Sequence, residues 1–382
     1  MSFSADELYA MVKSLPVIDW HNHLDIRMLQ EDRPLGSLYE VWVKADPYKH
    51  SAMRICGEPE RLITGDAPEQ EKWAAWVRTL PKIVGNPLFA WARMEMDFLG
   101  IDGRENVSLA DWTPSKMLSR FGVEYLSPCL GADSDLPLEG MHAQSGPMVV
   151  PSLRMNAGDD VSPAALERFH AAGCRVVDIS VDDAAQISAF SRQLSSVASF
   201  AAAQGWTMLL HLGALRDTSS RLRAAAGPVG GFAGMRSPVD PAMVAAFLNG
   251  LESQGALPRT ILMSLNPEAH AQLAVLSGSF VGEGMPGKVQ LGPAWWWCDH
   301  AEGICDVLEK NAAYGVLSTF VGMTTDSRSL LSFVRHDYFR RLLCRWVAGK
   351  VASGDFPADE AILRPMLENI CHHNARAMLF NG

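Results

Sequence analysis

Residues 17–23 read VIDWHNH, a short apolar run of strand-forming residues that ends in two histidines. Seven similar runs follow, most of them trailed by helix-compatible segments: residues 123–127 (VEYLS), 148–153 (MVVPSL), 175–180 (RVVDIS), 207–212 (TMLLHL), 260–266 (TILMSLN), 289–296 (VQLGPAWW) and 320–326 (FVGMTTD). Nearly continuous apolar character is typical of parallel strands that are covered on both sides. Eight strands alternating with helices predict an α/β fold, a closed (β/α)8 TIM barrel rather than an open sheet.

The segment between the first two predicted strands, residues 27–120, has a different character. It is rich in tryptophan and proline and contains helical patterns such as EQEKWAAWVRTL. We interpret it as a mainly helical insertion that covers the C-terminal face of the barrel, within one domain that spans residues 1–382. A separate helical domain is the alternative. The tail from residue 333 onward predicts further helices.

Composition excludes several classes of protein. The 382 residues are 48% hydrophobic and carry a formal net charge of −10, which argues against a general binder of nucleic acid or anionic membranes. Seven scattered cysteines without a CxxC motif favour neither disulfides nor a structural zinc site. We find no signal peptide and no run of the ~18 apolar residues that a spanning helix needs. We therefore expect a cytoplasmic protein, which could assemble as a homo-oligomer.

His21 and His23 form an H-x-H pair at the end of the first predicted strand. Side chains two positions apart on a strand point to the same face, so both imidazoles can reach one metal ion. Neutral imidazole suits Zn, Fe, Ni or Cu, and we expect one divalent ion, with Zn2+ as the favoured identity. The alternative is that two histidines at a strand end only hydrogen-bond to neighbouring loops.

Two further ligand-type residues fall at the same end of the predicted barrel. Active sites of such barrels lie at the C-terminal ends of the strands. His211 ends the fifth predicted strand and Asp326 ends the eighth. Because the first and eighth strands are neighbours in a closed barrel, Asp326 is predicted to lie beside His21 and His23. His211 is either a fourth ligand or a histidine that supports the ligands.

Arginines and tryptophans cluster at the same predicted rim. Arg328 follows Asp326 by two residues, and Arg154 and Arg216 lie at the ends of other strands. Each could form an ordinary salt bridge, but together they suggest an acidic ligand. Trp295 and Trp296 could line a substrate wall, with packing against the insertion as the alternative.

Several stretches together resemble the uronate (glucuronate) isomerase family of the amidohydrolase superfamily. The most specific is GKVQLGPAWWWCDH at 287–300 followed by GVLSTFVGMTTDSRSLLSFVRHDYFRRLLC at 315–344. DWHNHL at 19–24, LLHLGALR at 209–216, SLNP at 264–267 and ICHHNARAMLF at 370–380 also match. The fragment YKHSAMR at 48–54 matches more loosely and adds Arg54 to the candidate substrate-binding residues.

The resemblance implies an aldose–ketose isomerase that converts D-glucuronate to D-fructuronate, or D-galacturonate to D-tagaturonate. It places a metal on His21, His23 and Asp326, and it makes Asp326 the group that moves a proton between C2 and C1 through a cis-enediol. Arg328 and Tyr48 would assist at the sugar oxygens. The expected partner is a small acidic sugar.

The sequence also departs from the family pattern. Pro47 stands where members usually have a histidine, Ala90 and Arg93 replace two more, and residues 131–135 (GADSD) replace an acidic run. These departures indicate a divergent member. They leave open a metal-dependent hydrolase acting on another small acidic substrate, or a barrel that only binds its ligand.

Overall fold

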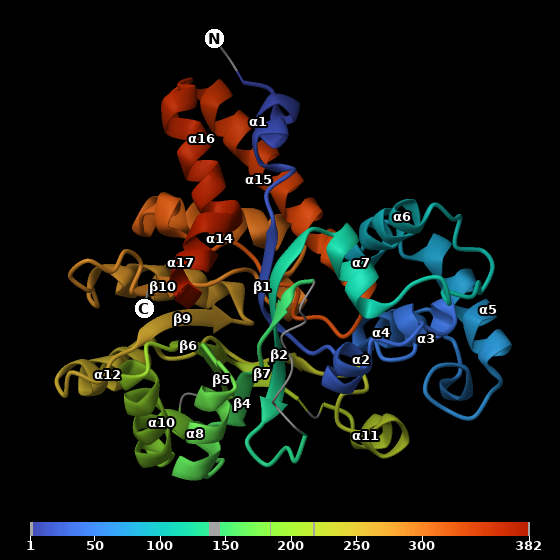
Figure 1. The fold of residues 1–382 in the computed structure, drawn as a ribbon, viewed down its shortest axis with the longest axis horizontal. Coiled ribbons are helices and arrows are strands. Elements are labelled where there is room, and N and C mark those ends of the chain that lie inside the picture. Colours follow the sequence, from blue (N-terminus) through green and yellow to red (C-terminus); the bar gives the residue numbers. More distant parts are fainter. Residues whose placement is uncertain (1–2, 137–145, 184, 217, 381–382) are drawn as a thin grey trace.

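The computed structural model describes residues 3–136, 146–183, 185–216 and 218–380. Its centre is a curved parallel sheet in which each strand pairs with the next one along the path (Figure 1). In spatial order the strands are β1 (Val17–Asn22), β2 (Val123–Gly131), β4 (Ser152–Asn156), β5 (Val176–Val181), β6 (Thr207–Leu212), β9 (Arg259–Ser264) and β10 (Val289–Leu291). This is the order in which strands follow one another around a (β/α)8 barrel, so the predicted fold class is confirmed.

The third predicted strand is present as two short pieces. β3 (Met148–Val149) pairs with the first half of β2, and β4 pairs with its second half. Pro151 lies between the pieces and has no N–H to donate to the ladder, which explains the interruption. A small antiparallel pair, β7 (Ala214–Leu215) with β8 (Gly234–Met235), follows the end of β6.

The prediction of a regular eighth strand at 320–326 is wrong, although the segment occupies the place of that strand. The Val321 N–H donates to the side chain of Gln290 in β10, and the Asp326 N–H donates to the carbonyl of His21 in β1. Gly322 and Asp326 have φ of 75° and 47°, which no extended strand can accommodate. An irregular segment therefore fills the gap between β10 and β1. The seventh strand is also shorter than predicted: it ends at Leu291, and Gly292 and Pro293 follow.

Helices that follow the strands pack on the outside of the sheet. They bury leucines, valines and aromatic residues in one continuous core with the strands. Side-chain caps begin several of them, with Ser162 and Asp240 as examples. These helices are α8 (Pro163–Ala171), α9 (Ala185–Ala189), α10 (Ser191–Ala203), α12 (Pro241–Glu252), α13 (His270–Val275) and α14 (Ala301–Tyr314). The short helix α11 (Ser220–Ala226), which follows β7, has no buried residue and takes no part in this core.

The predicted mainly helical insertion follows the first strand. Its helices group on one side of the sheet in Figure 1 and share a second core of buried tryptophans, among them Trp42, Trp73 and Trp76. The helices are α2 (Ile26–Glu31), α3 (Leu38–Trp42), α4 (Pro47–Ile55), α5 (Glu69–Thr79), α6 (Pro87–Leu99) and α7 (Pro114–Arg120). We still predict that residues 27–120 cover the ends of the strands. The position of Tyr48, described below, supports this prediction.

The C-terminal helices are also present as predicted. They are α15 (Val334–Ser353), α16 (Glu360–Glu368), a π-helical turn (Asn369–His373) and α17 (Asn374–Phe380). The N-terminal helix α1 (Ala5–Val12) packs against α15, and buried Arg340 of α15 donates to the carbonyls of Lys13 and Pro16 just before β1. Within the described ranges, no helix combines the length and apolar character needed to cross a bilayer.

Candidate active site

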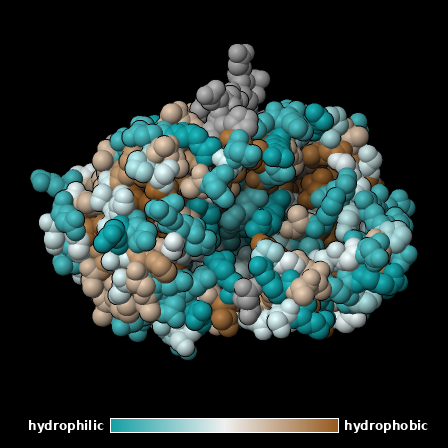
Figure 2. All heavy atoms as spheres, turned by 90° about the horizontal axis from the view of Figure 1, so that it is seen from below, coloured by the Kyte–Doolittle hydropathy of each residue, from teal (hydrophilic) through white to brown (hydrophobic). Residues whose placement is uncertain are grey.

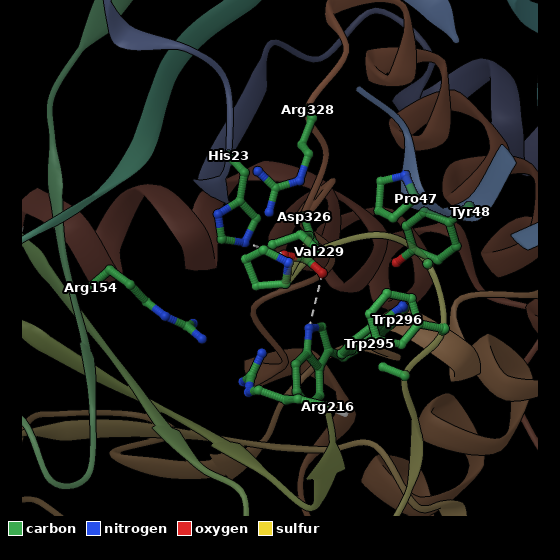
Figure 3. A pocket seen from close by; sticks show the side chains of 14 residues that line it. His23, Pro47, Tyr48, Arg154, Arg216, Val229, Trp295, Trp296, Asp326 and Arg328 are labelled. Carbon is green, nitrogen blue, oxygen red and sulfur yellow. Dashed lines mark hydrogen bonds and ion pairs between the residues drawn. The ribbon is translucent and has the colours of Figure 1, made fainter. Parts of the chain in front are cut away.

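His21, His23 and Asp326 meet where β1 ends. His21 Nε2 and His23 Nε2 lie 3.0 and 3.1 Å from the same oxygen of Asp326, Oδ1. The other oxygen, Oδ2, accepts a hydrogen bond of 3.0 Å from the indole N–H of Trp295 (Figure 3). The structure thus brings together residues that are about three hundred positions apart, because the segment that replaces the eighth strand lies against β1.

Electrostatics keep this carboxylate ionised. Burial alone would raise the pKa of Asp326, but hydrogen bonds from His21 and His23 outweigh burial and hold the pKa well below its usual range. Burial lowers the pKa of His23 to about 4, so its imidazole is neutral near pH 7. Burial would also lower the pKa of His21, but Cys129, Asp178 and Asp326 around it raise that pKa well above the ordinary value. The cluster therefore favours a positive charge at His21, carried by a proton or by a metal cation.

A second group of charged side chains lies directly beneath. The carboxylate of Asp178 in β5 is fully buried, accepts a hydrogen bond of 2.6 Å from His211 Nδ1 and pairs with Arg154. Arg154 and His211 hold the pKa of Asp178 well below its usual range, although burial opposes them. His211 Nε2 is buried and has no hydrogen-bond partner among the described residues. With Nδ1–H fixed on Asp178, the Nε2 lone pair is free to accept a proton donor or a cation.

This donor set fits a divalent cation. Imidazole nitrogens and a carboxylate oxygen are its usual ligands. His21, His23 and Asp326 would hold the ion, and the His211 ring lies 4.8 Å from the His21 ring, which makes its free nitrogen a further candidate. Cys129 Sγ is 3.2 Å from His21 Nδ1 and is a ligand-type atom beside the same cluster.

A cavity of about 230 Å³ opens beside the cluster. Its lining includes His23, Pro47, Tyr48, Arg154, Arg216, Val229, Trp295, Trp296, Asp326 and Arg328 (Figure 3). Seen from below Figure 1, the side on which β2 ends, the molecular surface is hollowed near its centre and hydrophilic side chains surround the hollow (Figure 2). The cavity is thus a small polar chamber with aromatic walls.

Three arginines give the cavity a positive lining. Arg154 and Arg216 both donate to the hydroxyl of Ser180, so their guanidinium groups converge, and Arg216 is also held by Asp182 at 3.0 Å. Arg328 makes no hydrogen bond or ion pair with the part of the chain that the structure describes. Its guanidinium lies close to His23 and Asp326 in Figure 3. An anionic ligand would find one unpaired and two fixed arginines here.

The remaining predicted site residues divide into two groups. Tyr48, at the start of α4, lines the cavity, and burial raises the pKa of its hydroxyl well above 10, so the hydroxyl remains a proton donor. Arg54, one helical turn and a half further on, is turned away: it pairs with Glu60 at 2.6 Å and donates to the carbonyl of Gly230. A role of Arg54 in substrate binding therefore stays a prediction.

Sequence reasoning did not place Asp178, Cys129 or Ser180 in the site. One signal was available for two of them. Asp178 and Ser180 are the polar residues of an otherwise apolar strand, VVDISV, and they share one face of it. A buried aspartate in a central strand needs partners, so it marks a functional or supporting position.

The fold and this site together define a class of protein: an α/β-barrel enzyme with a candidate metal-binding cluster and, beside it, a cavity lined by three arginines. A family model described as "Glucuronate isomerase" matches residues 1–112 and 180–379. The chain therefore belongs to the uronate (glucuronate) isomerase family, in agreement with the resemblance seen in its sequence.

Individual relatives agree over nearly the whole chain. The chain is 34% identical over 437 aligned positions to a uronate isomerase of Geobacillus thermodenitrificans, covering 95% of this chain and 94% of the relative. Identity is 32% to a uronate isomerase of Caldicellulosiruptor bescii, covering 97% and 95%. Among solved structures, a uronate isomerase of Thermotoga maritima superposes with a TM-score of 0.86 at 26% identity, covering 100% of this chain and 98% of the other.

Proposed function

We propose that the protein is a metal-dependent aldose–ketose isomerase that acts on a hexuronate. It would convert D-glucuronate to D-fructuronate, or D-galacturonate to D-tagaturonate. Membership of the family and the uronate isomerases among its relatives support this proposal. The observation that carries it is the position of Asp326, an ionised carboxylate in the wall of a small cavity that also presents three arginines.

The chemistry required is the movement of one proton between neighbouring carbons. In the open-chain aldose, the proton on C2 lies next to the C1 carbonyl, and its removal gives a cis-enediol after a proton reaches O1. Asp326 is ionised and so can take the C2 proton and return it to C1, while O2 loses its proton and becomes the ketone. Atoms balance without any outside reactant, since the sugar is only rearranged.

The negative charge that develops on oxygen needs stabilisation. A divalent cation held by His21, His23 and Asp326 would supply Lewis-acid polarisation of the sugar oxygens. Arg328 lies beside Asp326 without a hydrogen-bond or ion-pair partner among the described residues, and it can hold negative charge without competing as a base. Tyr48 keeps its proton at neutral pH and can donate it in a hydrogen bond to a sugar oxygen.

The far side of the cavity suits the carboxylate of a uronate. Arg154 and Arg216 both donate to the hydroxyl of Ser180, so their guanidinium groups are held in place before a substrate binds. Trp295 and Trp296 offer flat apolar faces to the C–H groups of the sugar. In this proposal the carboxylate of the substrate lies at Arg154 and Arg216, and its reacting carbons lie beside Asp326.

The proposal also names the metal ion, as zinc, and the location of the protein, as the cytoplasm. Zinc accepts imidazole nitrogen and carboxylate oxygen in this combination. All seven cysteines are free, as is usual in a reducing compartment. Metal analysis of the purified protein tests the ion, and size-exclusion chromatography with light scattering tests the expected homo-oligomer.

The activity is tested by NMR with the metal-supplemented protein and each of the two hexuronates. We expect one of them to yield its ketose. Asp326→Asn should lower kcat by about 10³-fold or more, because the proton acceptor is lost. Asp337→Asn, on α15 away from the cavity, is the matched control and should keep its activity. Ketose formation by the Asp326→Asn variant at the normal rate would remove Asp326 from the mechanism.

The same samples separate isomerase from hydrolase. Solvent enriched in ¹⁸O labels the product of a hydrolase, whereas an isomerase breaks no bond by adding water. If the label enters a cleaved product and neither uronate yields a ketose, the protein is a hydrolase and the proposed isomerase activity is wrong.

A further inference from the structure

Arg335 lies in the first turn of α15 and is almost completely buried. Its Nη1 donates a hydrogen bond of 3.0 Å to the carbonyl of Thr325, the residue directly before Asp326. The same nitrogen lies 3.5 Å from Asp299 Oδ2, at the edge of hydrogen-bond distance. Arg335 therefore contacts the peptide unit that leads into Asp326.

The same guanidinium also contacts the aromatic residues of the insertion. Its central carbon is 3.9 Å from the centre of the Trp91 ring and 5.3 Å from that of Tyr48. Tyr48 and Trp91 meet edge to face, with ring centres 6.4 Å apart. Arg335 is thus a physical link between Tyr48, which follows the first strand, and Asp326, near the other end of the chain.

Stability alone does not explain this arginine. Burying a charged group has a large desolvation cost, which is offset here by the attraction of three carboxylates, Asp299, Asp46 and Glu95, rather than by one tight ion pair. Nε of Arg335 finds no hydrogen-bond partner in the described ranges, which adds to the cost. A buried methionine of similar length would fill the space without either penalty. The contacts that only an arginine makes here are the hydrogen bond to Thr325 and the stacked faces of Trp91 and Tyr48.

We propose that Arg335 is a positioning residue that sets Asp326 and Tyr48 at the correct mutual distance on the two sides of the substrate. This inference rests on the proposed isomerase function. The carbonyl of Thr325 belongs to the peptide that precedes Asp326, so a shift of this carbonyl rotates that peptide and displaces the carboxylate of Asp326. Displacement of about 1 Å at a reacting group lowers a rate by about a hundredfold.

The test compares two pairs of variants in α15. Arg335→Met removes both the charge and the planar guanidinium group, whereas Arg335→Lys keeps the charge but loses the guanidinium group. Arg340, equally buried in the same helix, holds backbone carbonyls before β1 and supplies the matched controls Arg340→Met and Arg340→Lys. If Arg335 positions the reacting groups, kcat should fall about a hundredfold in Arg335→Met and about tenfold in Arg335→Lys, with KM nearly constant. The Arg340 variants lose the hydrogen bonds to the carbonyls of Lys13 and Pro16 and should lose thermal stability, but they should keep kcat within about threefold.

A second measurement does not depend on turnover. The indole N–H of Trp295 donates to Asp326, so its NMR resonance, assigned with Trp295→Phe, reports the place of that carboxylate. The resonance should shift in both Arg335 variants and stay in place in both Arg340 variants. Should Arg335→Met fail to fold, Arg335→Lys decides the matter alone.

The outcomes separate the two proposals. A wild-type protein that converts no uronate overturns the proposed function, and the indole resonance then decides whether Arg335 positions Asp326. In a protein that does convert uronate, unchanged kcat in Arg335→Lys and Arg335→Met overturns the positioning role. Equal losses of kcat in the Arg335 and Arg340 variants would also overturn it, since a merely structural role predicts them.

Discussion

Asp326 and Trp296 both line the cavity, and both have positive φ, 47° and 48°. Residues other than glycine rarely adopt this conformation, and where they do, the surrounding structure must hold them in it. Asp19 does so for Asp326: its buried carboxylate accepts from both the N–H and the hydroxyl of Thr325. The direction in which Asp326 presents its carboxylate is thus fixed by its neighbours.

Asp178 should matter for metal binding without touching the ion. Asp178→Asn takes away the carboxylate that orients His211 and neutralises Arg154. We expect metal affinity to fall about 10- to 100-fold, measured by competition with a chelator. The control is Asp182→Asn, which removes the carboxylate that pairs with Arg216 and should keep its metal. Equal affinity in both variants would show that Asp178 only fills space.

Asp299 makes stability depend on pH. Burial raises its pKa to about 7 against the attraction of Arg335, whereas an aspartate in the unfolded chain titrates near ~3.9. The folded protein then binds this proton more tightly, so its free energy of unfolding falls as pH rises from about 4 to about 7. Asp299→Asn should lack this pH dependence. Its free energy of unfolding in urea, relative to that of the wild type, should therefore increase between about pH 5 and about pH 8. The control Asp6→Asn, at an exposed position, should show no such increase. If the difference in free energy of unfolding between Asp299→Asn and the wild type is the same at every pH, Asp299 is not the group responsible.

Among single residues, the sequence predicted the candidate metal ligands better than the residues around them. That His21, His23 and Asp326 lie together was predictable because residue type and strand position coincide. Asp178 and Cys129 were missed, since their approach to His21 depends on how the barrel curves. The pairing of Arg54 with Glu60 was not predictable either, because the position of a residue in a motif does not show which residues it contacts in space.

Among the elements, the segment that takes the place of the eighth strand decides the site. It leaves the extended conformation at Gly322 and again at Asp326, and side chains of Gln290 and Asp19 replace ladder partners. Strand-like composition predicted its position correctly but not its shape. Periodicity reports which residues are buried, and the side-chain hydrogen bonds that bend this segment have no periodic signature.

Gly322→Ala tests that irregular shape. A Cβ there would lie 2.2 Å from the carbonyl oxygen of Ile370, on a backbone with φ of 75°. We expect a loss of at least about 1 kcal/mol in the free energy of unfolding. Gly250→Ala, inside α12 with nothing within 4 Å of its new Cβ, should instead be neutral or stabilising by about 0.4–1 kcal/mol. Comparable losses in the two variants would argue against a special role of the segment.

For the whole molecule, the candidate metal cluster joins the two ends of the fold. His21 and His23 come from β1, and Asp326 comes from the segment that completes the barrel. The predicted barrel order, the helical insertion and the C-terminal helices all follow from strand-like and helix-like patterns along the chain. How closely the insertion approaches the cavity could not be predicted, because it depends on contacts such as that of Tyr48 with Trp297.

Metal removal should therefore destabilise the entire fold. A ligand that binds only the folded state stabilises it by an amount that grows with its concentration over Kd, about 2.7 kcal/mol at a hundredfold excess. We expect a chelator to lower Tm and added Zn2+ to restore it, measured by differential scanning calorimetry. His23→Ala should have a Tm that responds to neither treatment. A wild-type Tm that is insensitive to both would place the ion outside this cluster.

The barrel is completed by residues close to its C-terminal helices, and this has a consequence for translation. A nascent chain displays both histidines of β1 early, but it gains their carboxylate partner only after most of the polypeptide has left the ribosome. Synthesis that stops before residue 326 yields a product with neither Asp326 nor the contacts that hold α1 against α15. If Asp326 is the proton acceptor as proposed, such a fragment has no means of catalysing the reaction.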